Sequence, residues 1–386
     1  MAGSLVKTIA FGKLWGAALL PALLLGACTT AGVGAGQPAA QAARAYYPAI
    51  DVAATGETQP VGTANTDAAD DPAIWRNPAD PAASLIVATD KKAGLYVYGL
   101  DGKVRSFLRA GRVNNVDLRD VTLPGGARRV LVAASDRSDK AVPKIALFWL
   151  DTATARLTEL GALPFLLGDH APMEAYGFCL GDRLGDGETG EIARAYVVMK
   201  DGTVTESLIA AGPSAPGGAA RLSADYIREV KLATQAEGCV VDDASHTLFV
   251  AEEDHAIWRI PLDTVLKAHP FARVGKADGL VDDIEGLAVA REPGASGRAW
   301  LLASSQGDNA YAVFDLASGG YRGRFRINGG AIDGTSDTDG IEVRLGDFGP
   351  QFPGGLFIAQ DGDNSPEAQN FKLVPWAAIR DALGLK

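Results

Sequence analysis

One arrangement of apolar and polar positions recurs six times along this chain of 386 residues. Three apolar residues precede a small or apolar residue, and polar groups follow. The copies are LIVATDKK (85–92), VLVAASDR (130–137), AYVVMKDG (195–202), LFVAEED (248–254), WLLASSQG (300–307) and LFIAQDG (356–362). A short apolar run bounded by polar residues is typical of a buried β-strand. We therefore expect one buried strand in each of six repeats.

A second series of strand-like segments precedes the first. Its copies are DDPAIW (70–75), NNVDLR (114–119), EAYGFCL (174–180), EGCVVDD (237–243), DIEGLAV (283–289) and DTDGIEV (337–343). Hairpin patterns with a Gly-containing turn follow many copies, as in 94–103 and 310–320. Helical patterns are confined to 262–268 and 375–383. Repeats of about 50 residues with several short strands are typical of propeller blades.

The fold class predicted from these repeats is all-β: a six-bladed β-propeller with mostly four-stranded antiparallel blades around a central channel. A two-sheet sandwich or a barrel is the alternative, but neither explains a paired signature that occurs six times. In the last copy we expect Ile341 and Val343 to be core positions. Glu342, between them in the strand period, should face away from the core and is the least expected metal ligand.

The N-terminus predicts export. Lys7 and Lys13 precede a short apolar region that ends in Leu-Gly-Ala-Cys at 25–28, a pattern too short for a membrane span. This ending resembles the lipobox of bacterial lipoproteins, so we expect a signal peptide at 1–27 and lipidation of Cys28. Thr29 after the cysteine favours the outer membrane of the cell envelope. An ordinary signal peptide with an incidental cysteine is the alternative.

Composition divides the remaining chain into a tether and a domain. Residues 28–59 are rich in Ala, Gly, Thr and Gln, which predicts a flexible tether, and the propeller should occupy 60–386. Beyond the signal, 34 basic and 47 acidic residues give a net charge of −13, which argues against nucleic acid as a partner. Cys179 and Cys239 have sequence contexts offset by one residue. On repeated strands this offset would make them face opposite ways, so we do not expect a disulfide.

Equivalent residues of a propeller lie at equivalent heights around one axis, so the polar residues of the two series should surround one mouth. The first series supplies Lys91, Lys92, Arg137, Lys200, Glu252, Glu253, Gln306 and Asp361. The second series supplies Asp70, Asp71, Tyr176, Glu237, Asp283, Glu285, Asp337 and Asp339. So many carboxylates at one mouth require raised pKa values or bound metal. Oxygen ligands without a His or Cys cluster favour a hard cation, calcium above magnesium.

Lysine and arginine beside these carboxylates suggest an anionic ligand such as phosphate. Together, cations and basic side chains predict metal-assisted hydrolysis of phosphate monoesters. The stretch at 333–343 is not an EF-hand loop, because position twelve from Asp333 is Arg344 where glutamate is needed. The chain also lacks an Arg-His-Gly motif, a Cys-x₅-Arg loop, a GKS or GKT phosphate loop and a Gly-x-Ser-x-Gly elbow.

Several of these stretches together resemble the β-propeller phytases. They are DDPAIW, TDKKAGLYVY, NNVDLR, ASDRS, EAYGF, AEEDHAIW, DIEGL, ASSQG, DGTSDTDGIEV, FIAQDGDN and NFKLVPW, in the family's order from about 60 to 380. The resemblance implies a calcium-dependent phytase that hydrolyses myo-inositol hexakisphosphate, as its calcium complex, with a calcium-activated water. Asp90 and Asp201 replace residues usual in the bacillary version of the family.

The resemblance also implies roles for individual residues, with several calcium ions both catalytic and structural. Ligands of active-site calcium, or of its water, would be Asp70, Tyr176, Glu237, Glu253, Asp283, Glu285 and Asp339. Gln306 would bind a calcium nearer the channel. Stabilising calcium would be bound by Asp71, Asp333, Asp361 and the Gly334 carbonyl. Phosphate would be bound by Lys91, Arg137 and Lys200, and the neighbouring phosphate by Lys92.

Two other functions fit the repeats. A calcium-centred lactonase or esterase propeller would need no cluster of basic residues at the mouth. A surface propeller that only binds phytate would release no phosphate. We expect a monomer whose only contact with the membrane is the N-terminal lipid anchor.

Overall fold

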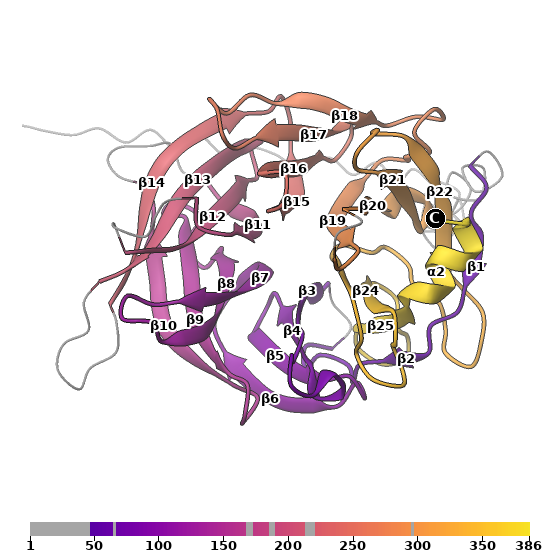
Figure 1. Cartoon of the computed structure of the whole chain (residues 1–386), viewed down its shortest axis with the longest axis horizontal. Helices are drawn as coiled ribbons and strands as arrows, with labels where there is room; N and C mark the ends of the chain where they lie inside the picture. Colours follow the sequence, from indigo (N-terminus) through magenta and orange to yellow (C-terminus); the bar gives the residue numbers. More distant parts are fainter. Residues whose placement is uncertain (1–46, 65–66, 167–172, 185–189, 213–220, 295–296) are drawn as a thin grey trace, which may run out of the picture. The chain divides into compact units, whose positions relative to one another are not determined.

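The computed structural model describes residues 47–386 except 65–66, 167–172, 185–189, 213–220 and 295–296. Six mainly antiparallel sheets follow one another around a common centre, and Figure 1 shows this arrangement from indigo through yellow. Neighbouring strands of a sheet are consecutive in the sequence over most of the fold. The predicted six-bladed β-propeller is confirmed, and a sandwich or barrel is excluded.

The first three blades each contain four consecutive strands. Blade one consists of β3 (Ala69–Trp75), β4 (Leu85–Asp90), β5 (Gly94–Gly99) and β6 (Val104–Arg109). Blade two consists of β7 (Val113–Thr122), β8 (Arg128–Asp136), β9 (Lys144–Asp151) and β10 (Arg156–Pro164). Blade three consists of β11 (Ala175–Gly181), β12 (Glu191–Met199), β13 (Thr203–Ala211) and β14 (Leu222–Lys231).

The last three blades complete the ring. Blade four consists of β15 (Ala236–Asp242), β16 (Thr247–Glu252), β17 (Ala256–Pro261) and β18 (His269–Arg273). Blade five consists of β19 (Ile284–Arg291), β20 (Ala299–Ser305), β21 (Ala310–Asp315) and β22 (Tyr321–Ile327). Blade six contains β23 (Ile341–Leu345), β24 (Gly355–Asp361) and β25 (Asn370–Pro375). Short 3₁₀ turns lie at Pro81–Ala83 and Gln306–Asp308.

The N-terminal segment closes the ring. Strand β2 (Gly56–Glu57) pairs antiparallel with β25 and becomes the fourth strand of blade six. Strand β1 (Ile50–Val52) adds a parallel fifth strand to blade five beside β22. The prediction of a flexible tether through residue 59 is therefore wrong for 50–57. Composition does not reveal strands this short, because most of their stability comes from pairing with partners remote in sequence.

Of the two predicted helices, the structure confirms the C-terminal one and lacks the other. Helix α2 (Trp376–Leu383) buries Trp376 and Ile379 in the same apolar cluster as Phe325 and Phe357. Residues 262–268 form no helix. The predicted signal peptide, Cys28 and most of the tether lie outside the described residues. Within the described residues, no helix is both long enough and apolar enough to span a membrane.

The core lies between successive blades, so each blade depends on its neighbours. Val87 and Val97 of blade one share an apolar cluster with Val132 and Phe148 of blade two. The predicted core positions Ile341 and Val343 are only 2% and 3% exposed. Because each sheet buries both faces, the second strand of every blade contains a nearly continuous apolar run, as in β4, β16 and β20.

An inter-blade disulfide joins Cys179 of β11 and Cys239 of β15, with an S–S distance of 2.08 Å. The expectation of no disulfide is therefore wrong. The two cysteines do lie on opposite faces of their own sheets, as the offset between the repeats predicts. However, the front face of one blade packs against the back face of the next. Residues on opposite faces of two adjacent sheets are therefore the ones that meet.

A β-bulge recurs at the same place on the first strand of blades one to five. The strand register shifts between Ala69 and Pro72, Val113 and Val116, Ala175 and Gly177, Ala236 and Cys239, and Ile284 and Leu287. A bulge changes the direction of the side chains it carries, and bulges are frequent beside active sites. The residues at these bulges are the ones that build the site described below.

Candidate functional site

Six equivalent side chains, one from each blade, define the site. They are Asp70, Asn114, Tyr176, Glu237, Glu285 and Asp339. The first five lie at the bulges, and Asp339 precedes β23. The repeat therefore places one polar side chain per blade at the same height. We call these residues the six-residue ring.

Glycines that directly follow members of the ring set its spacing. A Cβ on Gly177 would lie 1.8 Å from the Glu237 carbonyl oxygen, and one on Gly238 would lie 2.1 Å from that of Glu285. A Cβ on Gly286 would approach the Asp339 carbonyl to 2.7 Å, and the Gly286 amide donates to that oxygen at 2.8 Å. Only glycine lets the inner strands of adjacent blades come this close.

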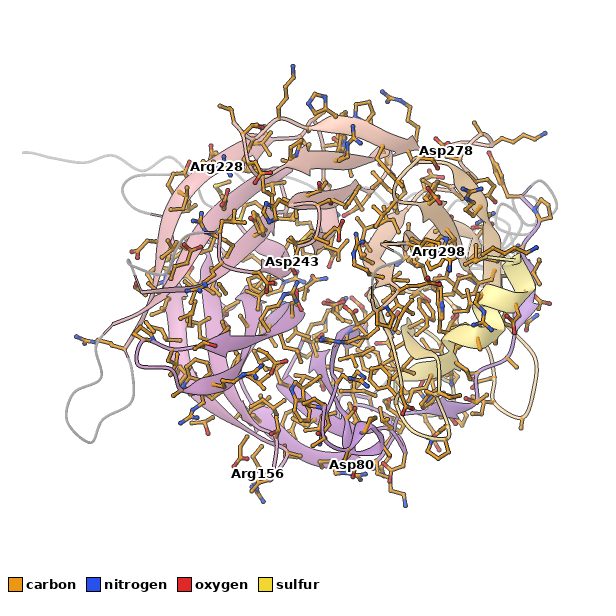
Figure 2. The ribbon with its side chains drawn as sticks, in the orientation of Figure 1. Asp80, Arg156, Arg228, Asp243, Asp278 and Arg298 are labelled. Carbon is orange, nitrogen blue, oxygen red and sulfur yellow. A yellow bond between two sulfur atoms is a disulfide. The ribbon has the colours of Figure 1, made fainter. Side chains whose placement is uncertain are left out.

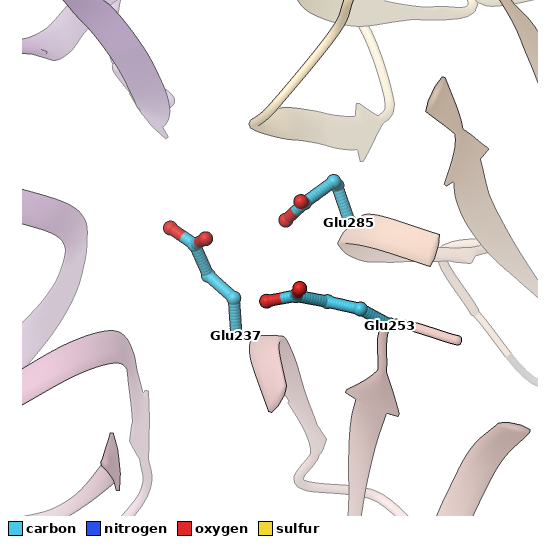
Figure 3. Close-up of side chains that lie close together, drawn as sticks. All are labelled: Glu237, Glu253 and Glu285. Carbon is cyan, nitrogen blue, oxygen red and sulfur yellow. The ribbon is translucent and has the colours of Figure 1, made fainter. Parts of the chain in front are cut away.

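Three glutamates converge on one point, as Figure 3 shows. Glu237, Glu253 and Glu285 each place a carboxylate oxygen within 4.8 Å of the others, and the residues are 4%, 8% and 7% exposed. Glu237 and Glu285 come from the bulges of β15 and β19, and Glu253 directly follows β16. Gln235 donates from Nε2 to both oxygens of Glu253 at 2.8 Å.

This cluster has the character of a cation site. Burial and Asp70 raise the pKa of Glu237 to about 7, and burial and Glu237 raise the pKa of Glu285. Burial is also the main cause of the raised pKa values of Glu253 and Asp283. Glu285 Oε2 is buried and accepts no hydrogen bond from the described part of the chain. An oxygen-only ligand set fits a hard cation such as calcium.

Lys91 joins the two ends of the ring. Its Nζ lies 2.8 Å from Asp70 Oδ1 in blade one and 2.9 Å from Asp339 Oδ2 in blade six. Asp67 Oδ1, at 2.7 Å, is a third carboxylate on the same ammonium. Burial alone would lower the pKa of Lys91, but Asp70 and Asp339 raise it above its usual range. On the far side of Asp339, Gln306 Nε2 donates to Oδ1 at 2.7 Å.

Two cations lie against the ring of Tyr176. The Arg137 guanidinium carbon is 5.2 Å from the centre of its ring, and Lys200 Nζ is 4.9 Å from it. Glu174 holds Arg137 through Nη2 and also pairs with Lys140 at 2.9 Å. These contacts place two of the predicted phosphate-binding side chains beside a predicted metal ligand.

The cavity above the ring has a volume of about 770 Å³. Its lining includes seven predicted site residues: Lys91, Tyr176, Glu253, Asp283, Glu285, Gln306 and Asp339. Asp70 lies fully buried beneath Lys91, while Lys92 is exposed and does not line the cavity. Sequence reasoning assigned no site role to Asp67 and Gln235, which also line it, or to Asn114 and Glu174, which hold other site residues.

The residues predicted to bind stabilising calcium form contacts apart from the cavity. Lys372, fully buried at its side chain, has its Nζ 2.5 Å from Asp333 Oδ1 and 3.2 Å from Asp361 Oδ2. Asp71 accepts from the Val116 amide at 2.9 Å, which links blades one and two. An internal ammonium between Asp333 and Asp361 was not foreseen. The assignment of stabilising calcium to Asp71, Asp333, Asp361 and the Gly334 carbonyl stays a prediction.

A second hollow of about 690 Å³ is lined by residues from the other ends of the inner strands. Its lining includes Asp117, Arg119, Glu342 and Asp243, the last of which is labelled near the centre of Figure 2. Burial and Asp117 raise the pKa of Glu342 to about 8. Glu342 is thus separate from the ring, as its place in the strand period predicted.

Comparisons with known proteins agree with this geometry. The model of the phytase family matches residues 17–386. A 3-phytase of Bacillus subtilis (strain 168) is 37% identical over 341 residues, which cover 86% of this chain and 85% of that protein. With the six blades and the acidic cavity already established, the extent of both matches shows that the chain belongs to the β-propeller phytase family.

Proposed function

We propose that this protein is a calcium-dependent 3-phytase that removes phosphate from myo-inositol hexakisphosphate, taken as its calcium complex. The observation that carries the proposal is the convergence of Glu237, Glu253 and Glu285 beside a set of basic side chains. A cavity lined by carboxylates would repel a polyanionic substrate unless bound cations made the local electrostatic potential positive. Calcium held by these residues would supply that charge, polarise a phosphoryl oxygen and lower the pKa of a bound water.

The chain's own residues would divide the remaining work. Glu237, Glu253, Glu285, Asp283, Asp339, Asp70 and Tyr176 would bind the active-site calcium ions or the water between them, and Gln306 would bind one nearer the channel. The raised pKa values of the buried carboxylates mean that calcium must displace protons at low pH. Metal affinity should therefore increase with pH through the neutral range.

Basic side chains would hold and orient the phosphate that is cleaved. Arg137 presents a guanidinium, and Lys200 and Lys91 present ammonium groups. Arginine binds phosphate oxygens in pairs, and lysine adds a point charge. Lys92, exposed in this arrangement, would bind a neighbouring phosphate of the same substrate.

We also propose structural calcium ions at Asp71 and at Asp333, Asp361 and the Gly334 carbonyl, with Lys372 balancing part of the negative charge. A ligand that binds only the folded state raises stability. Calcium should therefore raise the melting temperature even of variants that have lost activity.

The proposed cellular location rests on the N-terminal sequence alone. We propose that the chain is exported, lipidated at Cys28 and anchored to the outer membrane as a monomer. Mass spectrometry of the mature N-terminus should find acylated Cys28, and Cys28→Ser should release the protein from membranes. A mature chain that begins elsewhere without a lipid would contradict the anchor.

The test of the enzymatic function compares substrates. Calcium-loaded protein should release phosphate from phytate, and a lactone or carboxylic ester should not be hydrolysed. Chelation should stop phosphate release while circular dichroism still reports folded protein. Tight phytate binding without phosphate release would instead favour a propeller that only binds its ligand.

A further inference from the structure

One member of the six-residue ring has no assigned role. Blade two places Asn114 at the bulge position where the other blades have aspartate, tyrosine or glutamate. The residue is 0% exposed, so it faces neither solvent nor an open part of the cavity. A buried asparagine carries two donors and an acceptor, and their partners identify what it does.

Its amide connects two functional side chains. Asn114 Oδ1 accepts from Arg137 Nη1 at 2.5 Å, and Asn114 Nδ2 donates to Glu237 Oε1 at 2.6 Å. The second contact runs from blade two to blade four, over 123 positions of sequence. It therefore crosses the ring and bypasses Tyr176 of blade three.

The chemistry of the two partners restricts what can stand between them. A guanidinium only donates hydrogen bonds, and an ionised carboxylate only accepts them. The intervening group must accept on one side and donate on the other, which a carboxamide does. Aspartate has no donor for Glu237 when ionised, and leucine has neither group.

We propose that Asn114 is a positioning residue that couples Arg137, in the phosphate-binding set, to Glu237, in the calcium-binding set. The inference rests on the proposed calcium-dependent phosphatase function. Arg137 keeps its contacts with Glu174 and the Tyr176 ring when the amide is removed. Loss of Asn114 therefore removes one restraint on the guanidinium and one hydrogen bond to the Glu237 carboxylate, while the Tyr176 side chain still hydrogen-bonds Glu237.

The principal test is Asn114→Leu, which keeps the branched shape of the side chain and has no polar group. Calorimetry measures calcium binding to the metal-free protein, and inorganic phosphate is titrated as an inhibitor of the calcium-loaded enzyme. Both constants should weaken about tenfold, the scale expected for one lost hydrogen bond to a charged group. In an Arg137→Leu background, Asn114→Leu should still weaken calcium binding but no longer affect phosphate inhibition.

A second variant tests the two hydrogen bonds of Asn114 separately. Asn114→Asp keeps the acceptor for Arg137 and loses the donor for Glu237. It should leave phosphate inhibition at the wild-type value and change the calcium isotherm. Weakened phosphate inhibition in this variant would contradict the assigned contact with Arg137. This variant also decides the matter if the leucine variant does not fold.

Glu206→Gln is the matched control for lost stability. Glu206 is fully buried in blade three, where Arg194 and Arg228 hold it, and it is no part of the site. The control should lower the melting temperature and leave both binding constants unchanged. Wild-type constants in Asn114→Leu, or equal losses in Glu206→Gln, would overturn the inference. A wild-type protein that binds no calcium would refute the proposed function instead.

Discussion

Replacing Glu237 by glutamine should stabilise the metal-free protein at alkaline pH. Burial and Asp70 raise the pKa of Glu237 from 4.5 to about 7 in the fold. The folded chain therefore holds a proton that the unfolded chain has released, so stability falls as the pH rises from 4.5 through about 7. At about 1.4 kcal/mol per pKa unit, the ionised side chain costs about 3 kcal/mol at pH 8.

The assay is thermal unfolding in chelator at pH 4.5 and pH 8. For a domain of this length, a gain of about 3 kcal/mol corresponds to roughly 4 °C in melting temperature. Glu237→Gln should show that gain at pH 8 and almost none at pH 4.5. In saturating calcium the variant should instead melt at a lower temperature than the wild type, because it has lost a calcium ligand. The exposed carboxylate of Glu159 provides the control, and Glu159→Gln should change neither value.

The reasoning would be refuted by a variant that is no more stable than wild type at pH 8 in chelator. A gain of equal size at pH 4.5 would also refute it, because neutral Glu237 carries no cost there. Either result would mean that the carboxylate cluster is not under electrostatic strain without metal.

Three further predictions concern other parts of the fold. Glu342→Gln should raise the melting temperature at pH 9 but not at pH 4.5, because the pKa of Glu342 is raised to about 8, and it should not change calcium binding. Gly286→Ala should weaken calcium binding measured by calorimetry, because its Cβ would push the Asp339 strand away; an unchanged isotherm would contradict this. Replacing Cys179 and Cys239 by alanine should lower the free energy of unfolding by about 4 kcal/mol in denaturant titrations, because the disulfide closes a loop of 60 residues. The same replacement should leave kcat at 25 °C unchanged.

Sequence repeats were sufficient to predict the fold because each blade carries the same two strand signatures. They also placed most of the acidic side chains at one mouth, since equivalent positions of a propeller lie at equivalent heights. The short strands β1 and β2 escaped detection because their sequences are unremarkable without β22 and β25. The disulfide was missed because strand period alone ignores the front-to-back packing of blades.

Asn114 is the member of the six-residue ring that sequence reasoning missed. NNVDLR belongs to the second series, yet Asn114 carries no charge and is followed by no glycine. Only the shared bulge and the contacts with Arg137 and Glu237 reveal its place in the ring. Lys372 was missed for a different reason, because its partner Asp333 is remote in sequence and joins it only when blade six forms.

The central claim is that calcium held by the buried glutamates makes this propeller a phytase. The most direct measurement is the initial rate of phosphate release from phytate as free calcium is varied, for the wild-type protein and for Glu285→Gln. We predict a rate that rises from near zero to saturation in the wild type, and almost no phosphate release at any calcium concentration in the folded variant. Phosphate release in excess chelator, or a variant as active as the wild type, would contradict the account.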